Sequence, residues 1–365
     1  MSAFRSSRTP SGLVVPAGAQ LGRRRLLQAG AVAALGAPLL AACGSDSDSS
    51  PSASGGAADY GDLSVQLSWI KNIEFGGEYF AIENGYYKAG GFSSVNLIAG
   101  PTSAEGAVQS GKALVGLSAP PTTAAAIAEG ATLKIIGATF QKNPFCIVSP
   151  AKSPIKTPQD MIGKKIGVQA ANTSIFEGFL KANGIDKSKL KIVPVQFDPT
   201  VLTTGEVDGF TAYLTNEPIT LAESGFKNET LSFADNGLPL VAETFTVLQS
   251  EIDDNREKLK AYLTAEIKGW KDALADPAKT ADLAVNKYGK DQKLDLAEQQ
   301  KEAEAQAKLI QTDDTKANGL FTMTDELVAS NIEALGRSGQ TITADKLFDL
   351  SLLKEIYEAD KTLIG

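Results

Sequence analysis

The stretch that decides the fold class reads Leu63-Ser64-Val65-Gln66-Leu67-Ser68-Trp69, in which apolar and polar side chains alternate. Alternation with a period of two predicts a half-buried strand. Apolar residues then recur at spacings of four, three and four, at Phe75, Tyr79, Ile82 and Tyr86. This spacing predicts one face of a helix that ends near the glycines at 85, 90 and 91. A strand followed by a loop and a helix is the repeating unit of an α/β fold.

The same order repeats along the chain. Further strands are expected at 95–98, 113–117 and 133–140, with helices at 103–111 and 123–129. A second series has strands at 165–168, 191–195 and 209–213 and helices at 174–182, near 201 and at 219–223. After a strand at 245–248 the chain is expected to be helical, at 259–274, 281–288, 294–310, 325–335 and 347–359. This alternation predicts parallel sheets with helices on their faces.

A change of composition at 149–158, which holds three prolines and two lysines, predicts a boundary between two lobes. We expect lobe 1 to comprise residues 60–148 plus 246–365 and lobe 2 to comprise 149–245, with hinge strands near 145–151 and 240–248. The expected fold class is α/β, two-lobed, with a helical C-terminal segment. Such lobes enclose a cleft for small molecules and close around a ligand by hinge motion.

The N-terminal region has the pattern of an export signal. Three arginines at 23–25 precede a short apolar stretch at 26–40, which ends in Leu40-Ala41-Ala42-Cys43. Those four residues resemble the lipobox of bacterial lipoproteins, and residues 22–27 resemble the twin-arginine export pattern. The alternative is a transmembrane anchor or a chance alanine-rich segment.

This pattern predicts where the mature protein resides. We expect residues 1–42 to be a removed signal peptide, Cys43 to carry lipid, and residues 43–59 to form a flexible tether of small polar residues. The exported body would then be held at the outer face of the cell membrane.

Composition and charge exclude several classes of function. The net charge is −8, and loss of the five arginines of residues 1–42 would leave −13, which argues against nucleic-acid partners. The chain has no histidine, which excludes imidazole zinc sites and Ser-His or Cys-His nucleophile pairs. Apart from Cys43 the only cysteine is Cys146, expected to be buried, so no internal disulfide and no thiol cluster is expected. No cofactor and no metal site are expected. After residue 42 the only arginines are Arg256 and Arg337, which weighs against an oxyanion ligand.

Five segments carry a family resemblance: Trp69-Ile70-Lys71-Asn72-Ile73-Glu74-Phe75-Gly76-Gly77-Glu78-Tyr79-Phe80-Ala81, Gly85-Tyr86-Tyr87-Lys88-Ala89-Gly90-Gly91, Asp160-Met161-Ile162-Gly163-Lys164-Lys165-Ile166-Gly167-Val168, Gly205-Glu206-Val207-Asp208-Gly209 and Thr215-Asn216-Glu217-Pro218. They resemble the solute-binding proteins of ABC importers. Within that class the chain looks most like the branch of bacterial carriers of thiamine pyrimidine precursors, riboflavin carriers and the fungal thiamine pyrimidine synthase. The resemblance implies the type 2 periplasmic-binding-protein fold.

This sequence differs from other members of the branch in two ways, and the differences bear on which ligand and which activity the resemblance implies. Many members have histidine at the position of Phe75, and this difference bears on the identity of the ligand. The fungal synthase uses its own histidine and a cysteine-rich motif, and this chain has neither. The resemblance therefore implies ligand binding rather than synthesis.

Loops after strand ends hold the residues expected to bind the ligand. Trp69 is expected to stack on a planar ring, with a buried core position as the alternative. Glu217 is expected to pair with the N–C–NH₂ edge of a ring, and its alternative is an acid favoured by a helix N-terminus. The other expected binding residues are Asn72, Glu74, Gly76, Tyr79, Ser118, Gln141, Asn172, Thr173, Tyr213 and Asn216.

These other residues are expected to act in different ways. Asn72 and Glu74 would hydrogen-bond a ring edge, and Gly76 would let the ligand approach backbone N–H groups. Tyr79 has the spacing of a core residue but is the helix aromatic best placed to reach the ligand. Gln141 follows the fourth strand, near the hinge. Three residues lie at strand-to-helix turns, where each is either an N-cap or a ligand contact: Ser118, Asn172 and Thr173.

The expected function is capture of a flat N-heterocycle outside the membrane and its delivery to ABC permease subunits. A thiamine pyrimidine precursor is the leading ligand, with riboflavin as the first alternative and a sulfonate or nitrate as the next. The alternative from another class is a lipid-anchored hydrolase, which without histidine would need lysine-assisted or paired-carboxylate chemistry. Elsewhere, the charged residues Glu302 and Glu304 are expected on a solvated helix face.

Overall fold

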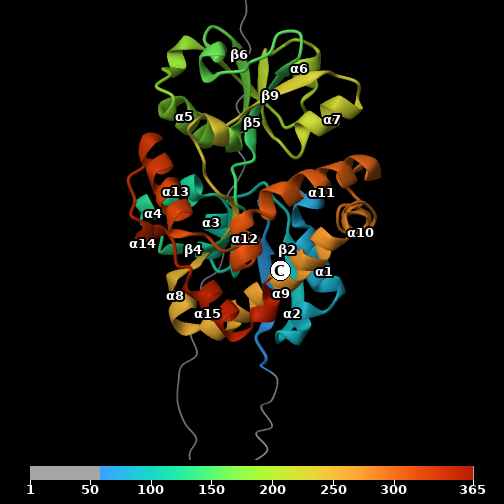
Figure 1. Cartoon of the computed structure of the whole chain (residues 1–365), viewed down its shortest axis with the longest axis vertical. Coiled ribbons are helices and arrows are strands. Elements are labelled where there is room, and N and C mark those ends of the chain that lie inside the picture. Colours follow the sequence, from blue (N-terminus) through green and yellow to red (C-terminus); the bar gives the residue numbers. More distant parts are fainter. Residues whose placement is uncertain (1–57, 365) are drawn as a thin grey trace, which may run out of the picture. The chain divides into compact units, whose positions relative to one another are not determined.

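The structure is a computed structural model that describes residues 58–364, all within one compact unit (Figure 1). The expected signal peptide, Cys43 and the tether up to residue 57 lie outside the described residues. Among residues 58–364, no helix is both long enough and apolar enough to span a membrane.

Two five-stranded sheets define the two lobes. Sheet A, in lobe 1, has the order β2-β1-β3-β10-β4 and is made of β1 (Gly61–Gln66), β2 (Phe92–Ile98), β3 (Val115–Ser118), β4 (Leu133–Phe140) and β10 (Ala242–Leu248). Sheet B, in lobe 2, has the order β7-β6-β8-β5-β9 and is made of β5 (Phe145–Pro150), β6 (Lys165–Gln169), β7 (Lys191–Val195), β8 (Gly209–Tyr213) and β9 (Asn228–Ser232). The α/β class and the two lobes predicted from the sequence are confirmed.

The sheets are mixed rather than parallel throughout. In sheet A, β10 runs antiparallel to both β3 and β4, and in sheet B, β5 runs antiparallel to both β8 and β9. These are the two strands that the chain enters directly after passing from one sheet to the other. The parallel prediction therefore holds for the strands that are connected by helices, and β9, which was not predicted, completes sheet B.

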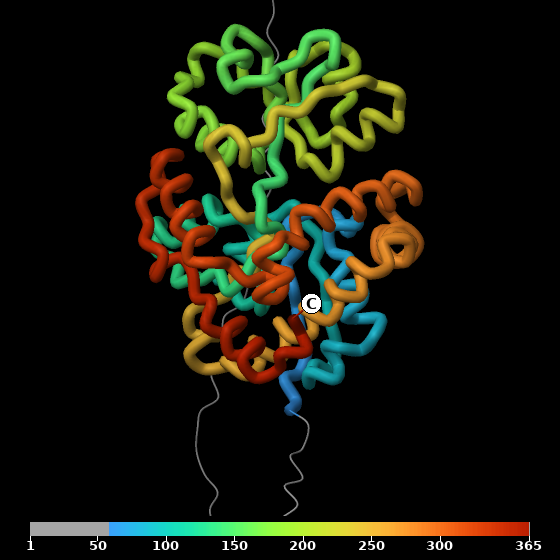
Figure 2. Tube along the Cα trace, viewed as in Figure 1, coloured from blue at the N-terminus to red at the C-terminus, as the bar shows by residue number. Residues whose placement is uncertain are grey.

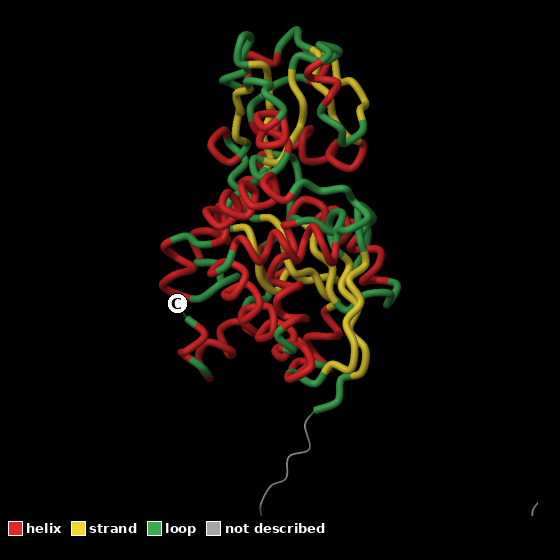
Figure 3. The backbone as a smooth tube through the Cα atoms, turned by 90° about the vertical axis from the view of Figure 1, so that its right-hand side faces the viewer, coloured by secondary structure: helices red, strands yellow, loops and turns green. Residues whose placement is uncertain are grey.

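Helices cover the strands of both lobes (Figure 3). The helices that precede β10 are η1 (Ile73–Phe75), α1 (Gly76–Glu83), α2 (Tyr86–Ala89), α3 (Ala104–Gln109), α4 (Pro120–Ala128), η2 (Pro158–Met161), η3 (Ala170–Asn172), α5 (Thr173–Ala182), η4 (Lys187–Lys189), α6 (Thr200–Thr203), α7 (Glu217–Glu223) and η5 (Ala234–Asn236). The C-terminal segment is helical, as predicted, with α8 (Gln249–Asp254), α9 (Arg256–Ala275), α10 (Pro277–Leu283), the π-helix η6 (Ala284–Tyr288), α11 (Leu296–Ile310), α12 (Asp313–Asn318), α13 (Asp325–Arg337), α14 (Ala344–Leu347), α15 (Ser351–Ala359) and η7 (Lys361–Leu363).

The chain crosses between the sheets at 141–144 and at 233–241 (Figure 2). The expected lobe boundaries at 148/149 and 245/246 differ from this strand pairing, because Phe145 already pairs with Tyr213 of sheet B, and Thr244 already pairs with Ser118 of sheet A. The proline-rich segment at 149–158 therefore lies after the crossing. The side-chain amide of Asn143 donates to the carbonyl of Leu238 at 2.9 Å, so the two crossing segments are bonded to each other.

Close packing of α1 on α9 and α10 fixes the loop that precedes α1. A Cβ on Gly76 would lie 2.3 Å from Cγ2 of Thr280, and one on Gly77 would lie 2.1 Å from the ring of Trp270. No side chain fits at either position, so glycine lets the helices approach. Trp270 and Tyr79 are fully buried here, and Cys146 is likewise buried in its strand, as predicted.

Candidate ligand-binding site

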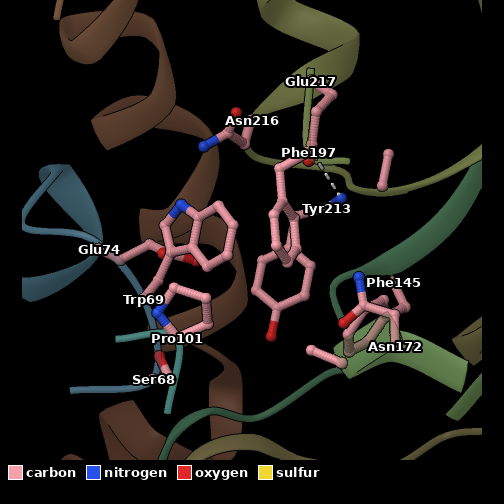
Figure 4. Close-up of a pocket in the computed structure, with 12 residues that line it drawn as sticks. Ser68, Trp69, Glu74, Pro101, Phe145, Asn172, Phe197, Tyr213, Asn216 and Glu217 are labelled. Atoms are coloured by element: carbon pink, nitrogen blue, oxygen red, sulfur yellow. Dashed lines mark hydrogen bonds between the residues drawn. The ribbon is translucent and has the colours of Figure 1, made fainter. Parts of the chain in front are cut away.

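A cleft lined by both lobes has a narrow inner part and a wider outer part. The inner part is a pocket of about 90 Å³ (Figure 4). The residues that line it are Ser68, Trp69, Glu74 and Pro101 from lobe 1, and Phe145, Ala171, Asn172, Phe197, Ala212, Tyr213, Asn216 and Glu217 from lobe 2. It lies where the loops after β1, β6, β7 and β8 meet, as expected for the carboxyl ends of strands in α/β sheets.

Aromatic rings from both lobes line the inner pocket. Trp69 is half-buried, and its ring lies edge-on to Phe197 with centroids 4.0 Å apart and an interplanar angle of 65°. Tyr213 is held edge-on by Phe145, with centroids 4.5 Å apart at 85°. A planar ligand can stack on such faces.

Glu217 is the first residue of α7, and its carboxylate turns back onto the strand before it. Oε2 accepts a hydrogen bond from the backbone N–H of Tyr213 at 2.9 Å, drawn in Figure 4, which leaves Oε1 for a ligand. Burial raises the pKa of Glu217 to about 7, opposed by the hydrogen bond from Tyr213. The group is therefore poised between a carboxylate and a carboxylic acid near neutral pH.

Glu74 lines the pocket from lobe 1, and helix α11 holds its loop. The amide oxygen of Gln299 accepts from the backbone N–H of Ile73 at 2.9 Å, and Nε2 of Gln306 donates to the carbonyl of Ile73 at 3.0 Å. Burial, with the negative charges of Glu243 and Glu217, raises the pKa of Glu74 well above its ordinary value. The loop therefore places at the pocket a carboxyl group whose protonated form is favoured, unless a ligand with several hydrogen-bond donors stabilises the carboxylate.

Glu302 extends the acidic character behind this loop, which corrects the expectation of a solvated helix face. Its side chain is buried, and Oε2 accepts from Nε2 of Gln299 at 2.8 Å. Burial, followed by the charges of Glu298 and Glu74, raises the pKa of Glu302 to about 9. Glu304, two residues on, is exposed as expected.

Glu243 is a further buried carboxylate of the cleft, and it was not predicted from the sequence. It is the second residue of β10 and borders the outer part, where Ser68 donates to its Oε2 at 2.7 Å. Burial raises the pKa of Glu243 to about 7, and the bond from Ser68 opposes this. Nothing in its strand pattern distinguishes it from an ordinary strand residue.

The outer part of the cleft is a wider space of about 580 Å³. Ser118, at the end of β3, donates to Oε1 of Glu105 at 2.5 Å, and Thr123 donates to the same oxygen at 3.0 Å. Asn172, before α5, lines both parts and donates to Gln169 at 2.9 Å. No lysine or arginine occurs among the described residues that line either part.

Of the expected binding residues, seven line the cleft: Trp69, Glu74, Ser118, Asn172, Tyr213, Asn216 and Glu217. The cleft also uses residues that were not expected, among them Ser68, Phe145, Phe197 and Glu243. Phe197 lies two residues after β7, so the strand-end rule that selected Trp69 would have found it. Phe145 is the first residue of β5, which runs antiparallel to its neighbours, so the strand-end rule does not apply to it.

Five expected residues do not line the cleft, and each has a structural role. The hydroxyl of Tyr79 donates to the carbonyl of Asn72 at 2.8 Å, and Asn72 in turn caps η1 by accepting from the backbone N–H of Glu74 at 3.1 Å. Gly76 makes room for α10. Gln141 donates to the carbonyl of Ala138 at 2.8 Å. The exposed Thr173 begins α5.

No metal site is evident in the part of the chain that the structure describes: no group of three or more His, Cys, Asp or Glu side chains is arranged to hold an ion.

The fold and the cleft define a solute-binding protein of the kind that serves ABC-type importers. The chain belongs to the family described as NMT1/THI5 like, which it matches over residues 72–280. It is 24% identical over 271 residues to the riboflavin-binding protein RibY of Chloroflexus aurantiacus, covering 68% of this chain and 74% of that protein. It is 22% identical over 222 residues to the formylaminopyrimidine-binding protein of Halalkalibacterium halodurans, covering 59% and 67% respectively.

Solved structures show the same fold at lower sequence identity. The alkanesulfonate-binding protein SsuA of Xanthomonas axonopodis pv. citri, bound to MOPS, superposes with a TM-score of 0.60 at 14% identity, covering 79% of this chain and 96% of that one. The two curated relatives are binding proteins rather than enzymes, in agreement with the expectation that the chain binds rather than converts its ligand.

Proposed function

We propose that the protein captures a flat N-heterocycle with an amino-substituted edge, such as a pyrimidine precursor of thiamine, for an ABC importer. The observation that carries the proposal is the inner pocket, where the rings of Trp69 and Tyr213 occur with the carboxyl groups of Glu74 and Glu217 and without a cationic side chain among the lining residues. Aromatic faces hold a planar ring, and carboxyl groups accept from its N–H and NH₂ donors.

Glu217 is suited to an aminopyrimidine edge because of its position and its pKa. With Oε2 engaged by Tyr213, a proton on Oε1 can be donated to a ring nitrogen while the same group accepts from the adjacent NH₂. A pKa raised to about 7 by burial allows this proton to be shared near neutral pH. The similarity to a formylaminopyrimidine-binding protein supports the same ligand class.

Riboflavin is a second candidate, favoured by two observations. The similarity to a riboflavin-binding protein extends over 271 residues, and the outer part of the cleft offers about 580 Å³ beside the aromatic pocket. A ligand with a ring system and a hydroxylated tail could use both parts.

An oxyanion ligand is disfavoured despite the shared fold with a sulfonate carrier. The first two positions of α4, which borders the outer part, are Pro120 and Pro121, and proline has no N–H to donate. The buried carboxyl groups of Glu74 and Glu243 and the half-buried carboxyl group of Glu217 would repel a negative charge.

Calorimetric titration of the exported body with an aminopyrimidine, riboflavin and an alkanesulfonate tests the proposal. We expect the aminopyrimidine to bind, and Glu217→Gln to weaken it by about tenfold, because an amide cannot carry the negative charge of the charge-assisted pair that forms when the ring nitrogen takes up the proton. Glu229→Gln, an exposed change on lobe 2, should leave the affinity unchanged. Tight binding of the sulfonate alone would refute the proposal, and binding of riboflavin alone would select the second candidate.

We also propose that lipid on Cys43 anchors the protein outside the membrane and that the loaded body docks on permease subunits. The pattern of residues 23–43 and the membership of a binding-protein family support this arrangement.

A further inference from the structure

Glu243 combines burial, a position at the cleft and an unusual backbone conformation. Its side chain is 2% exposed, and its φ is 47°. Residues other than glycine rarely adopt positive φ, because the Cβ atom then crowds the following carbonyl oxygen. Conformations of this kind persist where surrounding structure enforces them, and they concentrate at functional sites.

The conformation of Glu243 is enforced from both sides. Its neighbour Ala242 pairs with Phe140, and its other neighbour Thr244 pairs with Ser118 and Ala138, with an irregularity of register just beyond. Glu243 is thus not at a frayed strand end. The positive φ of Glu243 lowers the folding free energy gained by the sheet, so stability does not explain why a carboxylate is held at this position of the cleft.

Among the described residues that line the cleft beside Glu243 there is no lysine or arginine. Ser68 donates the one hydrogen bond that it accepts within residues 58–364, to Oε2, which leaves Oε1 without a protein donor. Its negative charge contributes to the raised pKa of three nearby acids, Glu74, Glu78 and Tyr213. A buried negative charge is costly unless a cation or donors compensate it, and here the protein supplies only a hydroxyl.

We infer that Glu243 is a specificity-determining residue that contacts a substituent of the bound ring, and that the cleft selects heterocycles whose substituent carries a positive charge, such as an ammonium group. The inference rests on the proposed function, because it takes the ring to lie in the inner pocket against Glu217. Ser68 lines both parts of the cleft, and Glu243 borders the outer part beside it. A short substituent that leaves the inner pocket past Ser68 therefore meets Glu243.

The test uses two aminopyrimidines that differ only in one ring substituent, aminomethyl or hydroxymethyl, titrated calorimetrically into the full exported body. We expect the wild type to bind the aminomethyl compound about tenfold more tightly, because only its ammonium group compensates the carboxylate. Glu243→Gln keeps the size of the side chain and should abolish this preference while changing the affinity for the hydroxymethyl compound less than about threefold. Glu266→Gln removes a buried carboxylate of the same lobe that does not line the cleft, and should preserve the preference.

A second pair of variants tests the backbone argument. Glu243→Gly relieves the left-handed conformation and should raise Tm by about 2 °C or more, while it also abolishes the preference. Lys293→Gly relieves the same kind of conformation, φ 58°, at an exposed position and should raise Tm without changing the preference. If Glu243→Gly raises Tm and abolishes the preference for the aminomethyl compound, Glu243 serves ligand binding rather than stability.

Each contrary outcome has a distinct meaning. Equal affinities of the wild type for the two compounds, or an unchanged preference in Glu243→Gln, would overturn the inference and leave the proposed function standing. If neither compound binds to folded wild-type protein, the proposed function fails and the inference fails with it. A lower Tm for Glu243→Gly would overturn the argument that the backbone is held at a cost.

Discussion

Trp69 and Trp270 are the two tryptophans of the chain, and the structure gives them opposite environments. Trp69 is half-buried at the inner pocket, whereas Trp270 is 1% exposed and packs on Gly77 in the core of lobe 1. The sequence predicted a binding role for Trp69 from its place after a strand, and it offered no comparable signal for Glu243. Strand-end position can be read from periodicity, but left-handed backbone at a central strand depends on pairing partners more than a hundred residues away.

The contrast between the tryptophans predicts a fluorescence signal. An aminopyrimidine that stacks on Trp69 should quench or shift its emission, while Trp270 should not respond. Trp69→Phe should abolish the ligand-dependent change and weaken binding, and Trp69→Ala should cost about 1–3 kcal/mol of binding free energy, by analogy with base stacking. A full ligand-dependent change in Trp69→Phe would place the binding site elsewhere.

Helix α11 supports the candidate site although none of its residues lines either part of the cleft. Gln299 and Gln306 bond both backbone polar groups of Ile73, so the helix fixes the position of Glu74 next to it. Apolar periodicity predicted this helix but not its glutamines, because a buried amide has the same sequence pattern as an exposed one.

This bracing predicts an indirect effect on affinity. Gln299→Leu should leave the buried N–H of Ile73 unpaired, destabilise the protein by about 1–3 kcal/mol, and weaken aminopyrimidine binding several-fold. The matched control is Gln300→Leu, one residue along on the exposed face of the same helix. Denaturant unfolding and calorimetry measure both effects, and equal behaviour of the two variants would show that α11 does not brace the loop.

The packing of α1 against α9 buries two carboxyl groups, those of Glu78 and Glu266. Tyr87 donates to Oε1 of Glu266, while Oε2 of each glutamate has no hydrogen-bond partner within the described residues. Burial raises the pKa of Glu266 to about 7, and burial together with the charge of Glu266 raises the pKa of Glu78. Both groups are therefore more easily kept protonated in the folded state than in the unfolded state.

A raised carboxyl pKa predicts that stability falls as pH rises. Below pH 4.5 Glu266 is protonated in both states, and between pH 4.5 and about 7 the unfolded chain loses this proton first, so the free energy of unfolding decreases over that window. Glu266→Gln should thus stabilise the protein at pH 8 by a few kcal/mol more than at pH 4. Glu257→Gln, on the exposed side of α9, should show no such pH dependence. Thermal unfolding of both variants at pH 4 and pH 8 tests the prediction, and equal pH dependence of the two variants would contradict it.

For the molecule as a whole, the order of strands and helices allowed the fold class to be predicted, but not the points at which the chain changes lobes. Phe145-Cys146-Ile147-Val148 is an apolar run that fits either sheet equally well, and its membership is decided by pairing with β8 and β9. The same is true of β10. The expected boundary at 245/246 divided its residues between the two lobes, although the strand pairs within sheet A. Local hydrophobic patterns indicate which residues are buried and whether a segment is a strand or a helix, but they do not indicate which strand pairs with which.

Anchoring outside the membrane is a prediction about the intact protein. Cys43→Ser should prevent lipid attachment, so the protein should accumulate as precursor or be released from the membrane fraction. Fractionation with metabolic labelling by a fatty acid measures this, and wild-type amounts of the variant in the membrane fraction would contradict it.

The insertion of β10 between β3 and β4 has a consequence for the order in which the protein assembles. Until residue 248 has been synthesised, β4 has no partner in sheet A and the sheet exists as two separate pieces. Sheet B, by contrast, is encoded without interruption between 145 and 232 and can complete itself first. A growing chain would therefore contain a complete lobe 2 while strands of lobe 1 still lack their partner β10, which leaves the unpaired edges of those strands open to chaperones during that interval.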